Sequence, residues 1–279
     1  MTSKNTIGII GQGFVGTAVR EGMEPFYNVE TYDKFKNSTY SSLEELVENV
    51  DFLFICLPTP MKKTGECDLS IIKEVIGRIE SCGQERILII KSTIPPGTTE
   101  MLNKECKNVK VVFNPEFLTE ANYIDDFKNQ SRIIIGGPRP YSTKVKTLFK
   151  KAFPQTPIIK THSTIAEMIK YFTNTFLATK VSFANEMKQF CDKVNVDYDK
   201  VAEYVLYDDR IGKTHLSVPG PDGKLGFGGS CFPKDINGLI YEMNKHEVAS
   251  LVLKAAWNKN LEVRPEKDWE KLKGRAVSE

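Results

Sequence analysis

The chain has 279 residues, of which 41% are hydrophobic and 27% charged, as in an ordinary globular protein with room for two domains. Its formal net charge is only +2, and basic residues alternate with acidic ones, which argues against nucleic acid as the main partner. No apolar run could span a bilayer, the N-terminus lacks a secretory pattern and the six cysteines show no zinc spacing, so we expect a cytoplasmic protein with no membrane partner and no metal.

Residues 1–160 alternate short β-rich apolar runs with amphipathic stretches. This alternation predicts an α/β fold built on a Rossmann-type, doubly wound parallel sheet. The expected strands are TIGII, NVETY, DFLFICL, RILIIK, VKVVF, RIIIGG and PIIK. Ser41 and Ser42 precede LEELVE, and Asp68 precedes LSIIKEVIGRIE, so both positions predict helix N-caps.

The first expected strand runs into a glycine turn, GQGFVG, whose glycines are Gly11, Gly13 and Gly16. Glycines allow a tight turn and let a pyrophosphate approach a helix N-terminus, whose N–H groups and dipole favour an anion. Asp33 ends the second strand about 20 residues on, where a carboxylate accepts from ribose hydroxyls and repels a 2′-phosphate. The pattern predicts NAD rather than NADP, a preference that the nearby Lys34 and Lys36 weaken.

A helical pattern starts at Ser163 or Thr164 and continues to about residue 194. Its apolar stripe consists of Ile165, Met168, Ile169, Phe172, Phe176, Phe183, Met187, Phe190 and Val194. Lys170 and Asn174 fall on the opposite side, which also carries apolar residues, so both sides of this helix are expected to contact protein. With a second helix at about 199–207, it forms a small all-helical domain over residues 161–245.

The segment SVPGPDGKLGFGGSCFPKD has too many glycines and prolines for regular structure. It contains Cys231, and a lone cytosolic cysteine is most often a small core residue. Two neighbours favour a reactive thiol instead, because the cation of Lys234 stabilises a thiolate and the carboxylate of Asp235 can move protons or orient water. The residues alone leave the nucleophilic and the core interpretation equally open.

The C-terminal region, residues 246–279, is expected to form a helix and a charged tail. The helical pattern itself covers about residues 236–261, and beyond Pro265 the tail contains a single tryptophan, Trp269, that could anchor it.

GFGGSCFPKD resembles the catalytic-cysteine segment of the UDP-glucose 6-dehydrogenase family, whose wider group includes GDP-mannose and N-acetylhexosamine nucleotide dehydrogenases. Other segments resemble family motifs in the same order along the chain: GQGFVG with Asp33, KSTIPPGTT, NPEFLTEAN with DFKNQSRIIIGG, and AEMIKYFTN. The resemblance implies oxidation of a sugar C6 alcohol to the carboxylate by two NAD molecules. It implies a nucleotide sugar, with UDP-glucose expected first, as the substrate.

The resemblance also implies a mechanism. Cys231 attacks the intermediate aldehyde, a second oxidation turns the thiohemiacetal into a thioester, and water hydrolyses it. Lys170 and Asn174 resemble the pair that stabilises the oxyanion, as an ammonium and an amide donor can. Asp235 and Thr93 hold water. Glu116 is similar to the family's acid-base glutamate, which completes the implied catalytic set.

The remaining implied contacts follow by position. The cofactor contacts are Gly11, Gly13, Phe14, Val15, Gly16, Asp33, Thr59, Thr93, Glu120 and Lys234. The substrate contacts are Phe117, Leu118, Lys170, Asn174, Arg210, Phe227 and Gly228, with Arg210 reaching in from a neighbouring subunit.

Simpler interpretations exist for several of these residues. Lys170 and Asn174 could be an exposed helical pair, and Glu116 a loop carboxylate after a proline. Thr93 could cap the helix that begins near residue 97, and Arg210 could be an ordinary surface charge.

The chain departs from the family pattern at its C-terminal end. Only residues 232–279 follow the cysteine, too few for a second α/β domain, so we expect a short variant, or a truncated chain, that lacks the C-terminal nucleotide-binding domain. The resemblance implies a homodimer through the 164–194 helix. Two alternatives stay open: a two-electron dehydrogenase of another hydroxy substrate, which needs no nucleophilic cysteine, and a non-catalytic NAD-binding subunit that completes a partner.

Overall fold

The structure is a computed structural model that describes residues 6–278; the ends of the expected first domain and of the tail, residues 1–5 and 279, lie outside the described residues. The chain divides into two compact units. The first consists of the residues up to Thr59 with Leu69–Lys170, and the second of Pro60–Asp68 with the residues from Tyr171 onwards. The domain boundaries expected at residues 160 and 245 stay predictions, because contacts within a unit do not show whether it folds alone.

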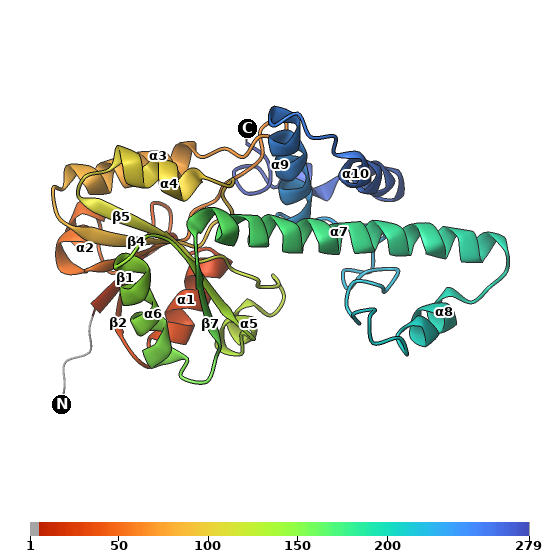
Figure 1. The fold of residues 1–279 in the computed structure, drawn as a ribbon, viewed down its shortest axis with the longest axis horizontal. Helices are drawn as coiled ribbons and strands as arrows, with labels where there is room; N and C mark the ends of the chain where they lie inside the picture. Colours follow the sequence, from red (N-terminus) through yellow and green to blue (C-terminus); the bar gives the residue numbers. More distant parts are fainter. Residues whose placement is uncertain (1–5, 279) are drawn as a thin grey trace. The chain divides into compact units, whose positions relative to one another are not determined.

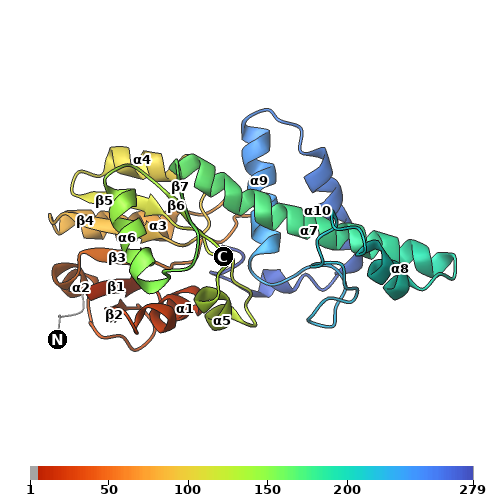
Figure 2. The same cartoon turned by 60° about the horizontal axis from the view of Figure 1, so that its bottom comes forward.

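The first unit contains a seven-stranded sheet with the strand order β2-β1-β3-β4-β5-β6-β7 (Figures 1 and 2). Its strands are β1 (Thr6–Ile10), β2 (Asn28–Tyr32), β3 (Phe52–Ile55), β4 (Arg86–Ile90), β5 (Val109–Phe113), β6 (Ile133–Gly136) and β7 (Ile158–Thr161). The expected Rossmann-type α/β fold is confirmed. The sheet is not parallel throughout, because β6 runs antiparallel to β5 through the single pair Phe113 and Gly136, and β7 is parallel to β6.

Helices cover both faces of this sheet (Figure 1). One face carries α2 (Leu43–Asn49), α3 (Ser70–Ser81) and α4 (Thr98–Glu105), and the other carries α1 (Phe14–Met23), α5 (Tyr123–Lys128) and α6 (Tyr141–Ala152). Side chains alternate between the faces along each strand, so Ile9 packs in one core and Ile10 in the other.

The two expected caps differ in outcome. Ser42 caps α2, because its hydroxyl accepts from the Glu45 N–H at 3.2 Å. The cap expected at Asp68 is wrong: Leu69 is the N-cap residue of α3, without a side-chain cap hydrogen bond. Asp68 belongs instead to the 60–68 segment of the second unit, where its N–H donates to the Pro60 carbonyl at 2.8 Å.

A long helix, α7 (Ser163–Lys193), starts in the first unit and continues into the second (Figure 1). Seven residues of its predicted apolar stripe are exposed: Ile165, Met168, Phe172, Phe176, Phe183, Phe190 and Val194. Lys170 and Asn174, on the opposite side, are buried at 2% and 6% exposure. The interpretation of Lys170 and Asn174 as an exposed pair is therefore wrong.

The second unit also contains α8 (Tyr198–Val205), α9 (Phe232–Lys245), α10 (Leu251–Val263) and a 3-10 turn, η1 (Asp268–Lys271). The single helix expected over residues 236–261 is wrong, because residues 246–250 separate α9 from α10 (Figure 2) and Glu247 takes a left-handed φ of 58°. The tail is anchored as expected, since Trp269 is 1% exposed and packs with Met61 and Ala276. Within residues 6–278, no helix combines the length and apolarity needed to cross a bilayer.

Candidate active site

The glycine turn lies between the ends of β1 and β3, where the strand order changes direction. Gly11 has a φ of 91°, and a Cβ atom there would lie 2.6 Å from the Cys56 carbonyl oxygen. A Cβ atom on Gly16 would lie 1.9 Å from the Gly11 oxygen, so packing within the unit requires both glycines. Gly13 is different, because it is exposed and a Cβ atom on it would meet no atom within 4 Å.

Gly13 is also the N-cap residue of α1, which has no side-chain cap and no acidic residue in its first turn. The first N–H groups of α1 therefore suit an anion such as a pyrophosphate. Phe14 and Val15 follow half-buried, and the Phe14 ring meets the Tyr123 ring edge-on at 6.2 Å between centroids.

Asp33 follows β2, and its carboxylate binds the backbone around it. Its Oδ2 accepts from the Gln12 N–H at 2.6 Å, and its Oδ1 accepts from the N–H groups of Phe35 at 2.8 Å and Lys36 at 3.1 Å. A carboxylate offers about four lone-pair positions, so one further donor, such as a ribose hydroxyl, can be accommodated. Together with the open glycine, these residues fit the adenosine and pyrophosphate of NAD.

The loops after β3 and β4 are joined by a hydrogen bond from the Thr59 hydroxyl to the Thr93 carbonyl at 2.8 Å, with both side chains buried. The capping interpretation of Thr93 is wrong, because Gly97 is the N-cap residue of α4. The N–H groups at the start of α4 are bound by the buried carboxylate of Glu167, which accepts from Gly97 at 2.6 Å and from Thr99 at 2.8 Å.

Lys91 is a buried residue that the sequence motifs do not single out. Its ammonium donates to Asn114 Oδ1 at 2.7 Å, and burial lowers the pKa of Lys91 to about 8 against the opposing attraction of Cys56 and Glu116. Burial likewise raises the pKa of the Cys56 thiol to about 12. The signal in the sequence was a lysine placed directly after the aliphatic run ILII of a strand.

Glu116 and Lys170 form a buried ion pair in the first unit. The Lys170 ammonium lies 2.9 Å from Glu116 Oε1 and donates to the Glu116 carbonyl at 2.6 Å, and Glu116 Oε2 accepts from the Leu118 N–H at 2.7 Å. Burial alone would raise the pKa of Glu116, but Lys170 and these hydrogen bonds hold it below its usual value. Glu116 does lie in a loop after a proline, as in the simpler interpretation, but it is buried and paired, and its lowered pKa makes it an ionised acceptor.

Phe117 lies next to this pair. Its ring centroid is 5.3 Å from the Lys170 ammonium and 4.4 Å from the Arg132 guanidinium, both within cation–π range. The expected substrate residues Phe117 and Leu118 are half-buried, whereas the expected cofactor residue Glu120 is exposed.

In the second unit, Cys231 is partly exposed and is the N-cap residue of α9. Its thiol thus lies at a helix N-terminus, where the helix dipole favours a thiolate. Burial would lower the pKa of Lys234, but Asp235, Cys231 and Cys67 together raise it above its ordinary value. A cation placed near a thiol favours the thiolate form in general. The irregular loop expected to contain Cys231 therefore ends at this residue, and the helix starts earlier than the expected residue 236.

Asp235, at 1% exposure, connects this helix start to α7. Its Oδ2 accepts from Asn174 Nδ2 at 2.6 Å, and its Oδ1 pairs with the Lys234 ammonium. A thiol, an ammonium and a carboxylate thus lie within one turn of α9, and the buried amide of Asn174 fixes the carboxylate. Such a group can attack a carbonyl carbon through sulfur and take up a proton at Asp235.

The other expected substrate residues of the second unit have structural partners. Phe227 is 4% exposed, and Asn260 binds both its N–H, at 2.7 Å, and its carbonyl, at 2.9 Å. A Cβ atom on Gly228 would lie 2.4 Å from the Asp268 carboxylate. The Arg210 side chain is 89% exposed and pairs with Asp208.

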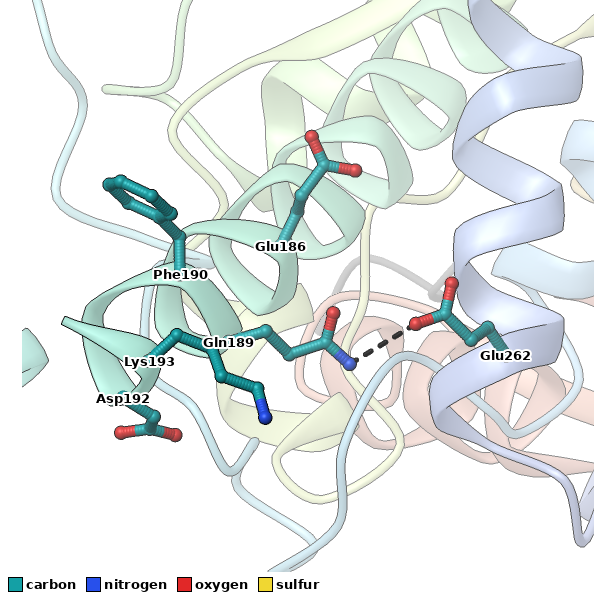
Figure 3. A pocket seen from close by; sticks show the side chains of 6 residues that line it. All are labelled: Glu186, Gln189, Phe190, Asp192, Lys193 and Glu262. Carbon is teal, nitrogen blue, oxygen red and sulfur yellow. Dashed lines mark hydrogen bonds between the residues drawn. The ribbon is translucent and has the colours of Figure 1, made fainter.

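A cavity of about 560 Å³ lies between α7 and α10 (Figure 3). It is lined by Glu186, Gln189, Phe190, Asp192, Lys193 and Glu262, none of them an expected site residue. Gln189 donates to Glu262 at 3.2 Å across it, and the Lys259 ammonium lies 2.9 Å from Glu262. The cavity is lined by polar and charged side chains with one phenylalanine, and its lining contains no thiol. Among residues 6–278, no three His, Cys, Asp or Glu side chains gather as a metal site.

Comparison with known proteins gives consistent results. Residues 22–153 match the NAD binding domain, and residues 164–262 the central domain, of the UDP-glucose/GDP-mannose dehydrogenase family. The UDP-glucose 6-dehydrogenase TuaD of Bacillus subtilis is 34% identical over 238 residues, which cover 80% of this chain and 50% of that protein. The chain therefore spans about half the length of the curated relatives it matches.

Two solved structures extend the comparison. A UDP-glucose dehydrogenase from the archaeon Pyrobaculum islandicum matches 97% of this chain and 71% of its own chain, with a TM-score of 0.83 and 28% identity. A 3-hydroxyisobutyrate dehydrogenase from Mycobacterium tuberculosis matches 95% of both chains with a TM-score of 0.75 but only 13% identity, and so shares the fold alone.

Proposed function

The chain belongs to the UDP-glucose/GDP-mannose dehydrogenase family, and on that premise we propose that it oxidises the C6 alcohol of a nucleotide sugar to the carboxylate with NAD, UDP-glucose being the expected substrate. The observation that carries the proposal is the start of α9, where Cys231 precedes the ion pair of the half-buried Lys234 and the buried Asp235. A dehydrogenase that stops at two electrons has no use for a thiolate placed in this way.

NAD, when bound, accepts the two electrons of each oxidation step, and the residues that would hold it are those of the glycine turn together with Asp33. The ionised Glu116 accepts the proton released from the alcohol, directly or through water. Lys170 and Asn174, one turn apart on α7, offer an ammonium and an amide to the developing oxyanion.

The Cys231 thiolate then bonds to the carbonyl carbon of the aldehyde and gives a thiohemiacetal. After the second oxidation the sugar is held as a thioester, and water, oriented by Asp235 and Thr93, breaks the carbon–sulfur bond. The products are the carboxylate and the regenerated thiol. One alcohol and one water thus yield one carboxylate, with four electrons transferred.

We further propose a homodimer formed through α7, because the exposed stripe offers an apolar surface that water does not favour. Arg210, at 89% exposure, is the residue expected to reach the substrate of the neighbouring subunit. The expected compartment is the cytoplasm, where reducing conditions keep the thiol of Cys231 available.

The test is a panel of nucleotide sugars with NAD, followed at the NADH absorbance and by product mass. We expect two equivalents of NADH per sugar and a carboxylate product. The Cys231→Ala variant should release at most aldehyde-level product, with its fold checked by circular dichroism.

Other results would redirect the assignment. One equivalent of NADH with an aldehyde or keto product from the unmodified protein would indicate the two-electron dehydrogenase. NAD binding by calorimetry without any binding of a nucleotide sugar would indicate the non-catalytic subunit.

A further inference from the structure

The turn that follows β2 presents an aromatic side chain to solvent. Phe35 is 88% exposed, although a phenylalanine ring is among the side chains that gain most from burial. The ammonium of its neighbour Lys34 lies 5.8 Å from the ring centroid. An exposed ring of this kind, placed beside a candidate binding site, is available to a planar ligand.

Hydrogen bonds fix the backbone that carries this ring. The Asp33 carboxylate accepts from the backbone N–H of Phe35 itself at 2.8 Å. The Gln12 side chain donates to the Asn37 carbonyl at 2.7 Å, and the Lys36 ammonium donates to the Gln12 carbonyl at 2.7 Å. The turn is thus bonded on both sides of Phe35 to the glycine turn, and its position relative to Asp33 is set before any ligand binds.

The chemistry of the neighbours selects the ligand. The Asp33 carboxylate can accept hydrogen bonds from the hydroxyls of the adenosine ribose, and the base attached to this ribose in a dinucleotide is a flat purine. Purines stack on aromatic faces regardless of hydrogen-bond pattern, and a cation such as Lys34 near the ring adds to the attraction.

We propose that Phe35 is the platform on which the adenine ring of the dinucleotide stacks. The inference rests on the proposed function, since it concerns the cofactor of that same reaction. It assigns to Phe35 a role in affinity for the adenosine half and none in the chemical steps.

The test is calorimetric binding of NAD and of ADP-ribose, which carries the adenosine half and no nicotinamide. The Phe35→Ala variant should bind both ligands about tenfold more weakly, and Phe35→Trp should bind them at least as well as the unmodified protein. Because the side chain is exposed, the thermal midpoint of Phe35→Ala should be unchanged. Tyr207→Ala, which removes an aromatic ring of 82% exposure from the second unit, is the matched control and should bind normally.

A second readout is independent of affinity. In Phe35→Trp, ADP-ribose should change the fluorescence of the new indole, whereas the unmodified protein, with Trp257 and Trp269, should show no such change. Unaltered binding by Phe35→Ala, with normal binding by the unmodified protein, would overturn the inference and leave the proposed function standing. Failure of the unmodified protein to bind NAD would overturn both. If Phe35→Ala kept its affinity for ADP-ribose but lost binding to a protein partner, Phe35 would be a docking residue and the proposal would be wrong.

Discussion

At the scale of single residues, the first unit buries charged groups that contribute differently to stability. The Glu116 and Lys170 charges compensate each other, whereas the Lys91 ammonium donates to the neutral amide oxygen of Asn114. Buried ion pairs are weak evidence for stability, because desolvation opposes their attraction. Their geometry is more informative about function than about the free energy of unfolding.

The protonation of Lys91 predicts how stability depends on pH. Its pKa of about 8 in the folded chain is below the ordinary value of 10.5, so between these pH values the unfolded chain binds more protons and stability rises with pH. The Cys56 pKa of about 12 is above the ordinary 9.0, so above pH 9 stability falls through this group. The free energy of unfolding should therefore rise from pH 8 to 9 by up to about 1 kcal/mol and then level off.

Urea denaturation of the unmodified protein and of two variants measures this profile. Lys91→Met should remove the rise between pH 8 and 9, and Cys56→Ala should extend the rise towards pH 10.5. If all three proteins gave the same dependence of stability on pH, the shifted pKa values of Lys91 and Cys56 would be wrong.

At the scale of secondary structure, one buried carboxylate of α7 binds the N–H groups at the start of α4. Glu167, at 0% exposure, accepts from the Gly97 N–H, the Thr99 N–H and the Thr99 hydroxyl. Glu167→Ala leaves these donors buried without an acceptor and should lower the free energy of unfolding by roughly 2–4 kcal/mol. Glu167→Gln keeps one oxygen acceptor and should lose about half as much.

The measurement is urea denaturation at neutral pH, with Glu105→Ala as the control. Glu105 is exposed at the other end of α4, so its removal should change stability by less than about 0.5 kcal/mol. Equal losses in the Glu167 and Glu105 variants would show that the carboxylate does not hold the start of α4.

The elements predicted from sequence are those with strong local periodicity. The strands of the first unit and the start of α7 at Ser163 follow from apolar runs and turn residues. The failures have non-local causes: Asp68 is bonded within a segment of the second unit, and the reversal of β6 depends on the path of the chain after β5. The break at residues 246–250 has no proline or glycine to mark it.

The sequence motifs select the candidate residues, but they do not give the hydrogen-bond partners of these residues. The motifs single out Glu116, Lys170, Asn174 and Asp235. The ion pair of Glu116 with Lys170 joins positions 54 residues apart, and the bond from Asn174 to Asp235 joins positions 61 apart. Spacing alone cannot give such pairings. The buried Lys91 was missed because one lysine at a strand end is usually exposed.

At the scale of the whole molecule, the exposed stripe of α7 predicts self-association. Phe172 and Phe176 are 64% and 57% exposed, and their rings stack at 6.2 Å between centroids. Phe176→Glu would bury a charge in the proposed interface, so it should convert a dimer to a monomer in sedimentation analysis. Lys193→Glu, an exposed charge change on the same helix, should leave the dimer intact. A monomeric unmodified protein would contradict the proposed dimer.

In the proposed reaction, Cys231 is the group that holds the oxidised sugar, and the four-electron oxidation depends on it. The direct measurement is the mass of the peptide that contains Cys231 after the protein is mixed with UDP-glucose and NAD and quenched in acid. The Asp235→Asn variant should slow hydrolysis of the thioester and so increase its yield. We predict a mass increase equal to the nucleotide-linked acyl group on that peptide, absent without NAD and absent in Cys231→Ser. Carboxylate formation at an undiminished rate by Cys231→Ser, with no adduct in the unmodified protein, would contradict a covalent role for Cys231.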